Sequence, residues 1–358
     1  MDTVERWETL LALAVQGRAL GVEVVGLALE EAEMAGWDLR LTTWKASSLV
    51  RAKLAGALLS RASLVGIDLT GADLAGSDLA GARLERANLE GAFLAGANLT
   101  GADLQGARLT GAIAERGHWL EVDLRGADLR DLDLSRCRVT TAQIEGADLR
   151  GTAFRLADFT GASWAEARLD ARSRFEQCVL DGCDWSGRAL AGTRLRRSSM
   201  VSAQLRGASL EGADLRQARL VGADLSEARM KGADLRQADL TGARLTGACL
   251  AGAQLGEATL TRASLRDADL RGAVVDRVVA EEASLAKADL GSASLRWADL
   301  SRADLRHATL DAAVLDFADL HRAFYDADDL QRAASRERLK TTDAARKRAE
   351  DFQARSPR

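Results

Sequence analysis

A large apolar residue recurs at every fifth position along nearly all of this 358-residue chain, and a small residue, usually alanine, stands two positions before it. Residues 72–76 (ADLAG), 97–101 (ANLTG) and 213–217 (ADLRQ) show the pattern. A period of five fits neither the α-helix, with about 3.6 residues per turn, nor the β-strand, with a period of about 2. A fixed short repeat predicts a solenoid instead, in which each repeat packs on its neighbours.

The repeat keeps its register over two long runs. If the large apolar residue is taken as the centre of each repeat, the first run extends from Val24 to Leu169 and the second from Phe175 to Leu330. Leu169 and Phe175 are six positions apart, so one extra residue lies between the two runs. A single insertion in a regular stack predicts a bulge or a bend at this place.

Each position of the repeat has its own chemistry. A chain that turns a corner every five residues points the centre, and the small residue two before it, inward; the other three positions face water. Glycine is common two positions after the centre between Gly66 and Gly111, but Arg, Glu and Gln replace it later. We therefore expect a positive φ in some repeats only. Five aromatic centres flank the extra residue and are expected to fill a widened core there: Phe154, Phe159, Trp164, Phe175 and Trp185.

The pattern resembles that of the pentapeptide-repeat proteins, whose consensus is A(D/N)LXX. The resemblance covers roughly residues 21–330. It implies an all-β solenoid, a right-handed quadrilateral β-helix in which four pentapeptides form one coil, so that residues twenty apart share a face. Because each coil contacts only its neighbours, both ends of the stack need caps.

The segments outside the repeats are predicted to be short helical caps. Residues 1–20 carry a helical apolar stripe, which we interpret as a capping helix over the first coil. A membrane-binding helix is the alternative, although acidic residues at positions 5 and 8 disfavour it. Residues 21–169 and 170–330 are the two runs of repeats on either side of the one-residue shift. Residues 331–358 are rich in Arg, Ala and acidic residues and are predicted to be a helical tail.

The usual motifs of catalysis and metal binding are missing. Cys178 and Cys183 lack the spacing of zinc ligands, and the histidines at positions 118, 307 and 321 fall on outward positions in different coils. The net charge of −4 gives no electrostatic footprint for nucleic acid, and no apolar run is long enough to span a bilayer. We therefore expect a cytoplasmic, non-enzymatic protein that has no cofactor or metal and binds neither nucleic acid nor membrane.

The outward positions of the first half are mildly acidic. Asp68, Asp73 and Asp78 are candidate partner-binding residues there, because their carboxylates would stand in for DNA phosphates in a topoisomerase-binding member of the family. In the second half, arginines follow several centres and have aspartates beside them. We interpret this as a self-neutralising surface rather than a binding stripe. The arginines are Arg196, Arg216, Arg236 and Arg296.

Exposed aromatic residues form a second candidate partner-binding site near the end of the repeats. Trp297 and Phe317 stand two positions after their centres and twenty residues apart, and Phe324 follows close by in the sequence. Aromatic side chains stacked on neighbouring coils suggest a contact surface. Packing beneath the C-terminal tail would explain them equally well.

The resemblance implies a protein that acts by binding another protein. The best-known activity of the family is to bind type II topoisomerases by imitating a DNA duplex, and our first hypothesis is inhibition of DNA gyrase, or self-resistance to topoisomerase poisons. The alternative is an interaction scaffold or an accessory component of a bacterial secretion system or regulatory complex, which the near-neutral charge and the lack of a Qnr-type loop favour. The C-terminal end is also a candidate homodimer interface.

Overall fold

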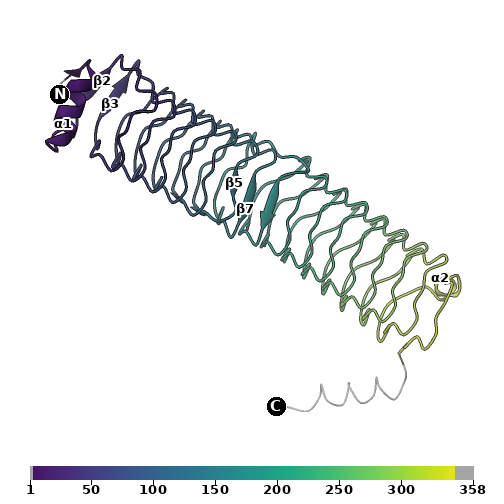
Figure 1. The fold of residues 1–358 in the computed structure, drawn as a ribbon. Coiled ribbons are helices and arrows are strands. Elements are labelled where there is room, and N and C mark those ends of the chain that lie inside the picture. Colours follow the sequence, from purple (N-terminus) through teal and green to yellow (C-terminus); the bar gives the residue numbers. More distant parts are fainter. Residues whose placement is uncertain (1–2, 343–358) are drawn as a thin grey trace, which may run out of the picture. The chain divides into compact units, whose positions relative to one another are not determined.

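The computed structural model describes residues 3–342, and the chain forms two compact units, Met1–Asp184 (unit 1) and Trp185–Arg358 (unit 2). Within each unit the backbone winds in stacked coils (Figure 1). Regular strands are short and are confined to unit 1 within the described residues. The elements are β1 (Thr3–Val4), α1 (Trp7–Val15), β2 (Glu23–Val25), β3 (Thr43–Lys45), β4 (His118–Leu120), β5 (Asp133–Leu134), β6 (Arg138–Thr140), β7 (Ala153–Arg155), β8 (Arg174–Glu176) and α2 (Ala327–Gln331).

Parallel backbone pairing with a 20-residue offset builds both units. Three small parallel sheets have the orders β1-β2-β3, β4-β6 and β5-β7-β8. Single parallel bridges continue the pattern elsewhere, as from Ser48 to Asp68 and from Asp68 to Asn88. An offset of 20 residues is four pentapeptides, so each coil has four sides. The predicted quadrilateral β-helix is the fold observed.

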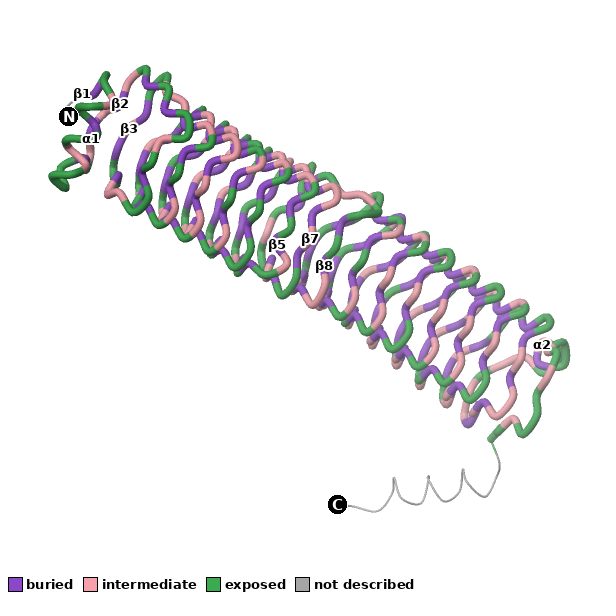
Figure 2. The backbone as a smooth tube through the Cα atoms, viewed as in Figure 1, coloured by how far each residue is buried: buried purple, intermediate pink, exposed green. Residues whose placement is uncertain are grey.

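The core consists of the centre residues and the small residues two before them. Leu74 and Ala72 in unit 1, and Leu215 and Ala213 in unit 2, are all fully buried. Buried and exposed residues alternate along every coil (Figure 2). Because a coil turns every five residues, the interior has room for one large and one small side chain per side.

The extra residue between the two runs changes the pairing offset inside unit 1. Asp148 pairs with Arg168, twenty positions on, whereas Ala153 pairs with Arg174, twenty-one positions on. The buried Ser173 hydroxyl donates to the Leu149 carbonyl oxygen at 3.0 Å and holds the longer corner in place. Beside it, aromatic centres pack as a cluster with neighbouring ring centroids 4.9 to 6.1 Å apart: Phe154, Phe159, Trp164 and Phe175.

The N-terminal end of unit 1 is capped by α1 and β1. β1 pairs in parallel with β2, and α1 buries Leu10 completely. Trp7 of α1 stacks on Trp37 with ring centroids 5.4 Å apart. Part of the apolar stripe seen in the sequence therefore packs on the first coils, whereas Leu11 and Val15 are 39% and 80% exposed.

At the C-terminal end, the helix lies before the segment predicted for it. α2 spans Ala327–Gln331, and residues 332–340 are not helical. They pair with the last full coil, where Ser335 pairs with Val314 and the backbone N–H of Leu315 donates to the Ser335 carbonyl oxygen at 2.9 Å. The open edge of a coil exposes unpaired backbone groups, and one more row of chain satisfies them. Residues 343–358 of the predicted helical tail lie outside the described part of the chain.

The added row also changes the environment of one histidine. His321 was expected to face water, but it is only 3% exposed. The chain covers this corner, because the backbone N–H of Leu320 donates to the Lys340 carbonyl oxygen at 2.7 Å.

Almost every corner has a left-handed residue two positions after its centre, whatever the side chain. φ is 54° at Arg51, 60° at Gln217 and 61° at Trp297. The expectation of a positive φ in only some repeats is therefore wrong. The reason is that every coil must hydrogen-bond in register with the next, as when the Gln217 N–H donates to the Arg236 carbonyl oxygen at 3.0 Å, and this imposes one backbone path on all corners.

Candidate partner-binding surface

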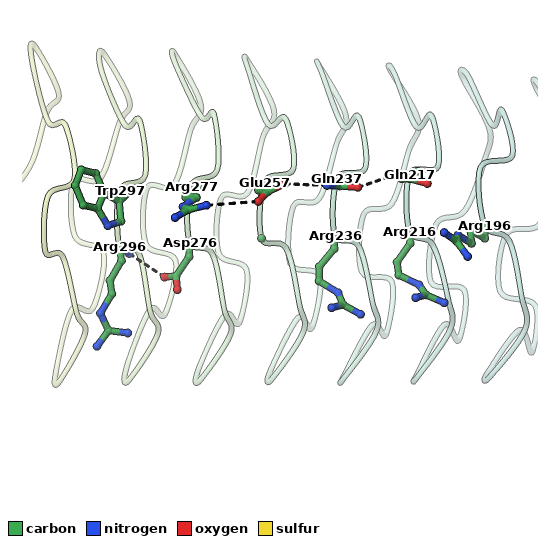
Figure 3. Close-up of a pocket in the computed structure, with 11 residues that line it drawn as sticks. Arg196, Arg216, Gln217, Arg236, Gln237, Glu257, Asp276, Arg277, Arg296 and Trp297 are labelled. Atoms are coloured by element: carbon green, nitrogen blue, oxygen red, sulfur yellow. Dashed lines mark hydrogen bonds and ion pairs between the residues drawn. The ribbon is translucent and has the colours of Figure 1, made fainter.

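One side of unit 2 carries two parallel columns of side chains that line a cavity of about 640 Å³ (Figure 3). The first column stands one residue after successive centres and the second column two residues after them. We call this surface the unit 2 groove. Its first column is Arg196, Arg216, Arg236, Gly256, Asp276 and Arg296, and its second column is Gln217, Gln237, Glu257, Arg277 and Trp297.

Hydrogen bonds between neighbouring coils tie the second column together. Gln217 Nε2 donates to Gln237 Oε1, and Gln237 Nε2 donates to Glu257 Oε2, each at 2.8 Å. Arg197 Nε continues the row at one end by donating to Gln217 Oε1 at 2.7 Å. Arg277 Nη1 lies 3.8 Å from Glu257 Oε1 at the other end. These contacts hold one wall of the groove in a defined conformation.

Two arginines of the first column are paired with aspartates of their own repeats. Arg216 donates to Asp214 and Arg236 donates to Asp234, with closest distances of 2.6 Å in both pairs. Hydrogen bonds from Arg216 hold the pKa of the Asp214 carboxyl below its usual range. Figure 3 shows Arg216, Arg236 and Arg296 extending to the same side of the column. This part of the surface is self-neutralising, as the sequence predicts.

The end of the groove at residues 194–197 has an excess of positive charge. Arg197 bonds to a neutral amide, and within the described residues Arg196 Nε is buried and has no hydrogen-bond partner. The corner at residues 194–197 has three arginines. On the same side, the next two coils add two arginines and two aspartates. The surplus is therefore three positive charges, carried by Arg194, Arg196, Arg197, Arg216 and Arg236 less Asp214 and Asp234.

Gly256 interrupts the first column and opens a hollow between Arg236 and Asp276. A Cβ atom placed on Gly256 would meet only the Asp276 carbonyl oxygen at 3.8 Å and Arg236 Cγ at 3.9 Å. The φ angle of Gly256 is not positive, so the backbone does not require glycine. The missing side chain at Gly256 leaves space in the groove, and the backbone conformation does not explain why glycine stands there.

Beyond the hollow, the groove ends at an aromatic stack. Trp297 and Phe317 lie on neighbouring coils with ring centroids 4.1 Å apart and an interplanar angle of 3°. Trp297 is 55% exposed, and Arg338 lies over the Phe317 ring, 5.7 Å from its centroid. The added C-terminal row thus covers the Phe317 side of the stack and leaves Trp297 open.

The structure brings together only some of the residues that the sequence proposed as a site. Trp297 and Phe317 form one surface. Phe324 pairs with Asp304, which lies two pentapeptides further round the coil than Trp297, so Phe324 lies on another side. Phe324 is 60% exposed, and Arg306 lies over its ring. The four-sided coil separates residues that are close in the sequence.

Asp68, Asp73 and Asp78 lie on three successive sides of unit 1. Each has one carboxylate oxygen bound by the backbone N–H two residues later, at 3.0, 3.0 and 3.2 Å respectively. Among the described residues, none of the three forms an ion pair with an arginine or lysine. They differ in this from the paired aspartates Asp214 and Asp234, but they do not form a stripe along one face.

Comparison with known proteins identifies the repeat. The model of the Pentapeptide repeats family, in eight copies, matches residues that amount to more than half of the chain: 47–86, 77–113, 123–161, 198–237, 238–275 and 288–324. This chain is a pentapeptide-repeat protein. No curated protein matches its sequence significantly.

Solved structures of other family members resemble this pentapeptide-repeat protein. One from the Arabidopsis thaliana thylakoid lumen is 30% identical, over 30% of this chain and 68% of its own, with a TM-score of 0.24. HetL, involved in heterocyst differentiation regulation in the cyanobacterium Nostoc sp. strain PCC 7120, is 29% identical over 75% of this chain and 96% of its own, with a TM-score of 0.23. QnrB1, a plasmid-mediated fluoroquinolone resistance protein, is 18% identical over 67% of this chain and 100% of its own, with a TM-score of 0.17.

Reasoning from the sequence missed half of the groove in this pentapeptide-repeat protein. The arginine column was recognised, but the second column and the hollow at Gly256 were not. Writing the repeats in rows of twenty would have placed Gln217, Gln237 and Glu257 one above another. It would also have shown Gly256 as the small residue in a charged column.

Two further properties of the described residues bear on function. No group of three or more His, Cys, Asp or Glu residues is arranged to hold a metal ion within residues 3–342. Over the same range, every helix is too short or too polar to cross a membrane.

Proposed function

We propose that this protein is a non-enzymatic protein-binding module that uses the unit 2 groove as its partner site. The observation that carries the proposal is the half-exposed stack of Trp297 on Phe317 at the open end of a preformed groove. Solenoid proteins recognise partners through surfaces built from successive repeats. Aromatic and arginine side chains dominate the binding energy of protein interfaces.

The groove has the parts that such an interface needs. Covering the exposed part of Trp297 removes apolar surface from water, which stabilises a complex by about 25 cal/mol per Å². The hydrogen-bonded row from Gln217 to Glu257 is already ordered, so little side-chain entropy is lost when a partner binds. A preorganised wall with one aromatic anchor favours binding over catalysis.

Affinity capture with a matched pair of proteins tests the proposal. The wild type and a Trp297→Gly/Phe317→Gly variant are each immobilised. Host lysate whose protein complexes have been mildly cross-linked is then passed over both. We expect a protein that binds the wild type and is lost with the variant. Equal capture by both proteins would show that the groove is not the partner site.

A second candidate function is topoisomerase binding through the acidic side chains of unit 1. The observation in its favour is that Asp68, Asp73 and Asp78 form no ion pair among the described residues, in contrast to Asp128 and Asp148, each of which accepts hydrogen bonds from the arginine two positions later. In a DNA mimic, free carboxylates take the place of phosphates. Inhibition of gyrase supercoiling by micromolar protein, weakened by Asp68→Lys/Asp73→Lys/Asp78→Lys, would support it, and no effect on any topoisomerase of the host would exclude it.

A second copy of the chain is a further candidate partner of the aromatic stack. Sedimentation of the wild type and the Trp297→Gly/Phe317→Gly variant distinguishes this case. A dimer that becomes a monomer in the variant would make the groove a homodimer interface.

A further inference from the structure

The two ends of the unit 2 groove differ in chemistry. The end at Arg194, Arg196 and Arg197 has surplus positive charge, and the other end is the aromatic stack of Trp297 and Phe317. Between them lie the hollow at Gly256 and a row of side-chain amides. Because its two ends differ, the groove selects both the chemistry of a ligand and the direction in which the ligand binds.

We infer that the groove binds an extended acidic segment of another protein, with carboxylates at the arginine end and an aromatic or large aliphatic side chain against Trp297. This inference rests on the proposed function and adds the class of partner. Charge complementarity supports it, because the surplus arginines attract carboxylates, and Arg196 Nε, which has no hydrogen-bond partner within the described residues, gains an acceptor.

The dimensions of the groove set the spacing of the two recognised groups. Arg196 and Trp297 belong to coils five apart, and neighbouring coils are about 4.8 Å apart, which gives about 24 Å. An extended chain advances about 3.3 Å per residue, so the carboxylates and the apolar anchor are about seven residues apart.

The middle of the groove can hold the main chain of the segment. The hollow at Gly256 has room for a chain that a column of long side chains would keep away. Gln217 and Gln237 each use one amide N–H in the row of hydrogen bonds, and a side-chain amide has a second N–H. Both glutamines line the groove, so these second donors can bond to carbonyl oxygens of the segment.

The same charges disfavour a nucleic acid in this groove. A single strand has a phosphate at every nucleotide and would bring several of them close to Asp234, Glu257 and Asp276. A peptide can keep its carboxylates at the arginine end and place neutral residues along the rest of the path. The alternation of charge therefore favours a protein segment.

The experiment uses the full-length protein and a fluorescein-labelled peptide, Glu-Glu-Glu-Gly-Ser-Gly-Ser-Gly-Trp, followed by fluorescence anisotropy at low salt. We expect saturable binding that weakens as salt is added. The Arg196→Ser/Arg197→Ser variant and the Trp297→Gly variant should each lower the affinity about tenfold. The control is Arg306→Ser, an exposed arginine on another side, which should bind as the wild type does.

Peptide variants test the chemistry and the spacing. Replacing the three glutamates with glutamine, or removing three spacer residues, should weaken binding about as much as the protein substitutions do. Equal binding of the glutamine peptide, no saturable binding of the glutamate peptide, or tighter binding of a 15-mer of thymidylate would each overturn the inference. Self-association through the groove, seen by sedimentation, would overturn it as well.

Capture of host proteins through the groove distinguishes a failure of this inference from a failure of the proposed function on which it rests. Capture that depends on Trp297 and Phe317 and also on Arg196, Arg197 and low salt supports both. If capture depends on the two rings but is unchanged in Arg196→Ser/Arg197→Ser, the proposed binding function is retained and the inference of an acidic segment is overturned.

Discussion

Trp297 and Phe317 stack face to face across two neighbouring coils at backbone positions that favour glycine. Their ring centroids are 4.1 Å apart, and their φ angles are 61° and 63°. A bulky residue in the left-handed region is strained compared with glycine. The two rings are therefore present in spite of the local backbone preference, which agrees with a role in binding.

The Trp297→Gly/Phe317→Gly variant should fold and should be about as stable as the wild type. Loss of the ring stack costs stability, and relief of two left-handed corners restores it. We expect a melting temperature within a few degrees of the wild type by circular dichroism. A fall of more than about 10 °C, equivalent to a few kcal/mol in a domain of this size, would show that the stack is a structural cap instead.

Leu215→Asp should destabilise the protein strongly, whereas Arg216→Ala should not. Leu215 is fully buried, so its replacement places a carboxylate among stacked leucines with no cationic partner and costs more than about 4 kcal/mol. Arg216 forms a partly exposed ion pair, whose loss costs about 1 kcal/mol or less. Chemical denaturation of both variants measures the difference, and similar midpoints would refute the assignment of inward and outward positions. Leu74→Asp should behave as Leu215→Asp does.

Gly256→Arg should fill the hollow without harming the fold. The nearest atoms to a Cβ at this position are 3.8 and 3.9 Å away, and φ is not positive. The control, Gly252→Arg, has no atom within 4 Å of an added Cβ but a φ of 66°, and should cost about 1 kcal/mol more. We expect Gly256→Arg to keep the stability of the wild type and to lose partner capture by the groove. Retained capture would show that the hollow is not occupied.

The protein should lose stability below about pH 4. Arg216 lowers the pKa of the Asp214 carboxyl below that of an unfolded chain, and the arginine two positions later does the same for Asp148. Such a group stabilises the fold above its unfolded pKa, near 3.9, and this contribution disappears as the pH falls through the folded pKa. Urea titrations between pH 5 and pH 2 should show a shallower decline for Asp214→Asn and for Arg216→Ala. An unchanged slope in Asp214→Asn would mean that the pair has no net effect.

Cys249 should be the first cysteine to react under native conditions. Burial raises the pKa of the Cys178 and Cys183 thiols to about 12 and that of Cys137 to about 11, so few thiolates form at pH 8. Cys249 is partly exposed. Timed iodoacetamide labelling followed by peptide mass spectrometry should show modification of Cys249 first and of the other three only after unfolding. Equal rates at all four sites would indicate that the coils open locally.

The sequence alone determined the fold and the burial of its core. A period of five with a large centre and a small residue two before it is a local property, so it marked Leu74 and Leu215 as inward without knowledge of the rest of the structure. It also located the extra residue between Leu169 and Phe175, because a break in register is visible wherever the repeat is unbroken on both sides. The stacking of Trp297 on Phe317 followed from their separation of twenty.

Tertiary structure decided which outward residues share a surface. Phe324 is close to Phe317 in the sequence but lies on another side of the coil, and Asp68, Asp73 and Asp78 lie on three sides. The groove depends on contacts between residues twenty apart and on the absence of a side chain at Gly256. Neither feature is visible in the five-residue pattern. The last row, residues 332–340, follows the path of a coil and is not helical, because the open edge of the final coil needs hydrogen-bond partners, and this need arises only once the coils have stacked.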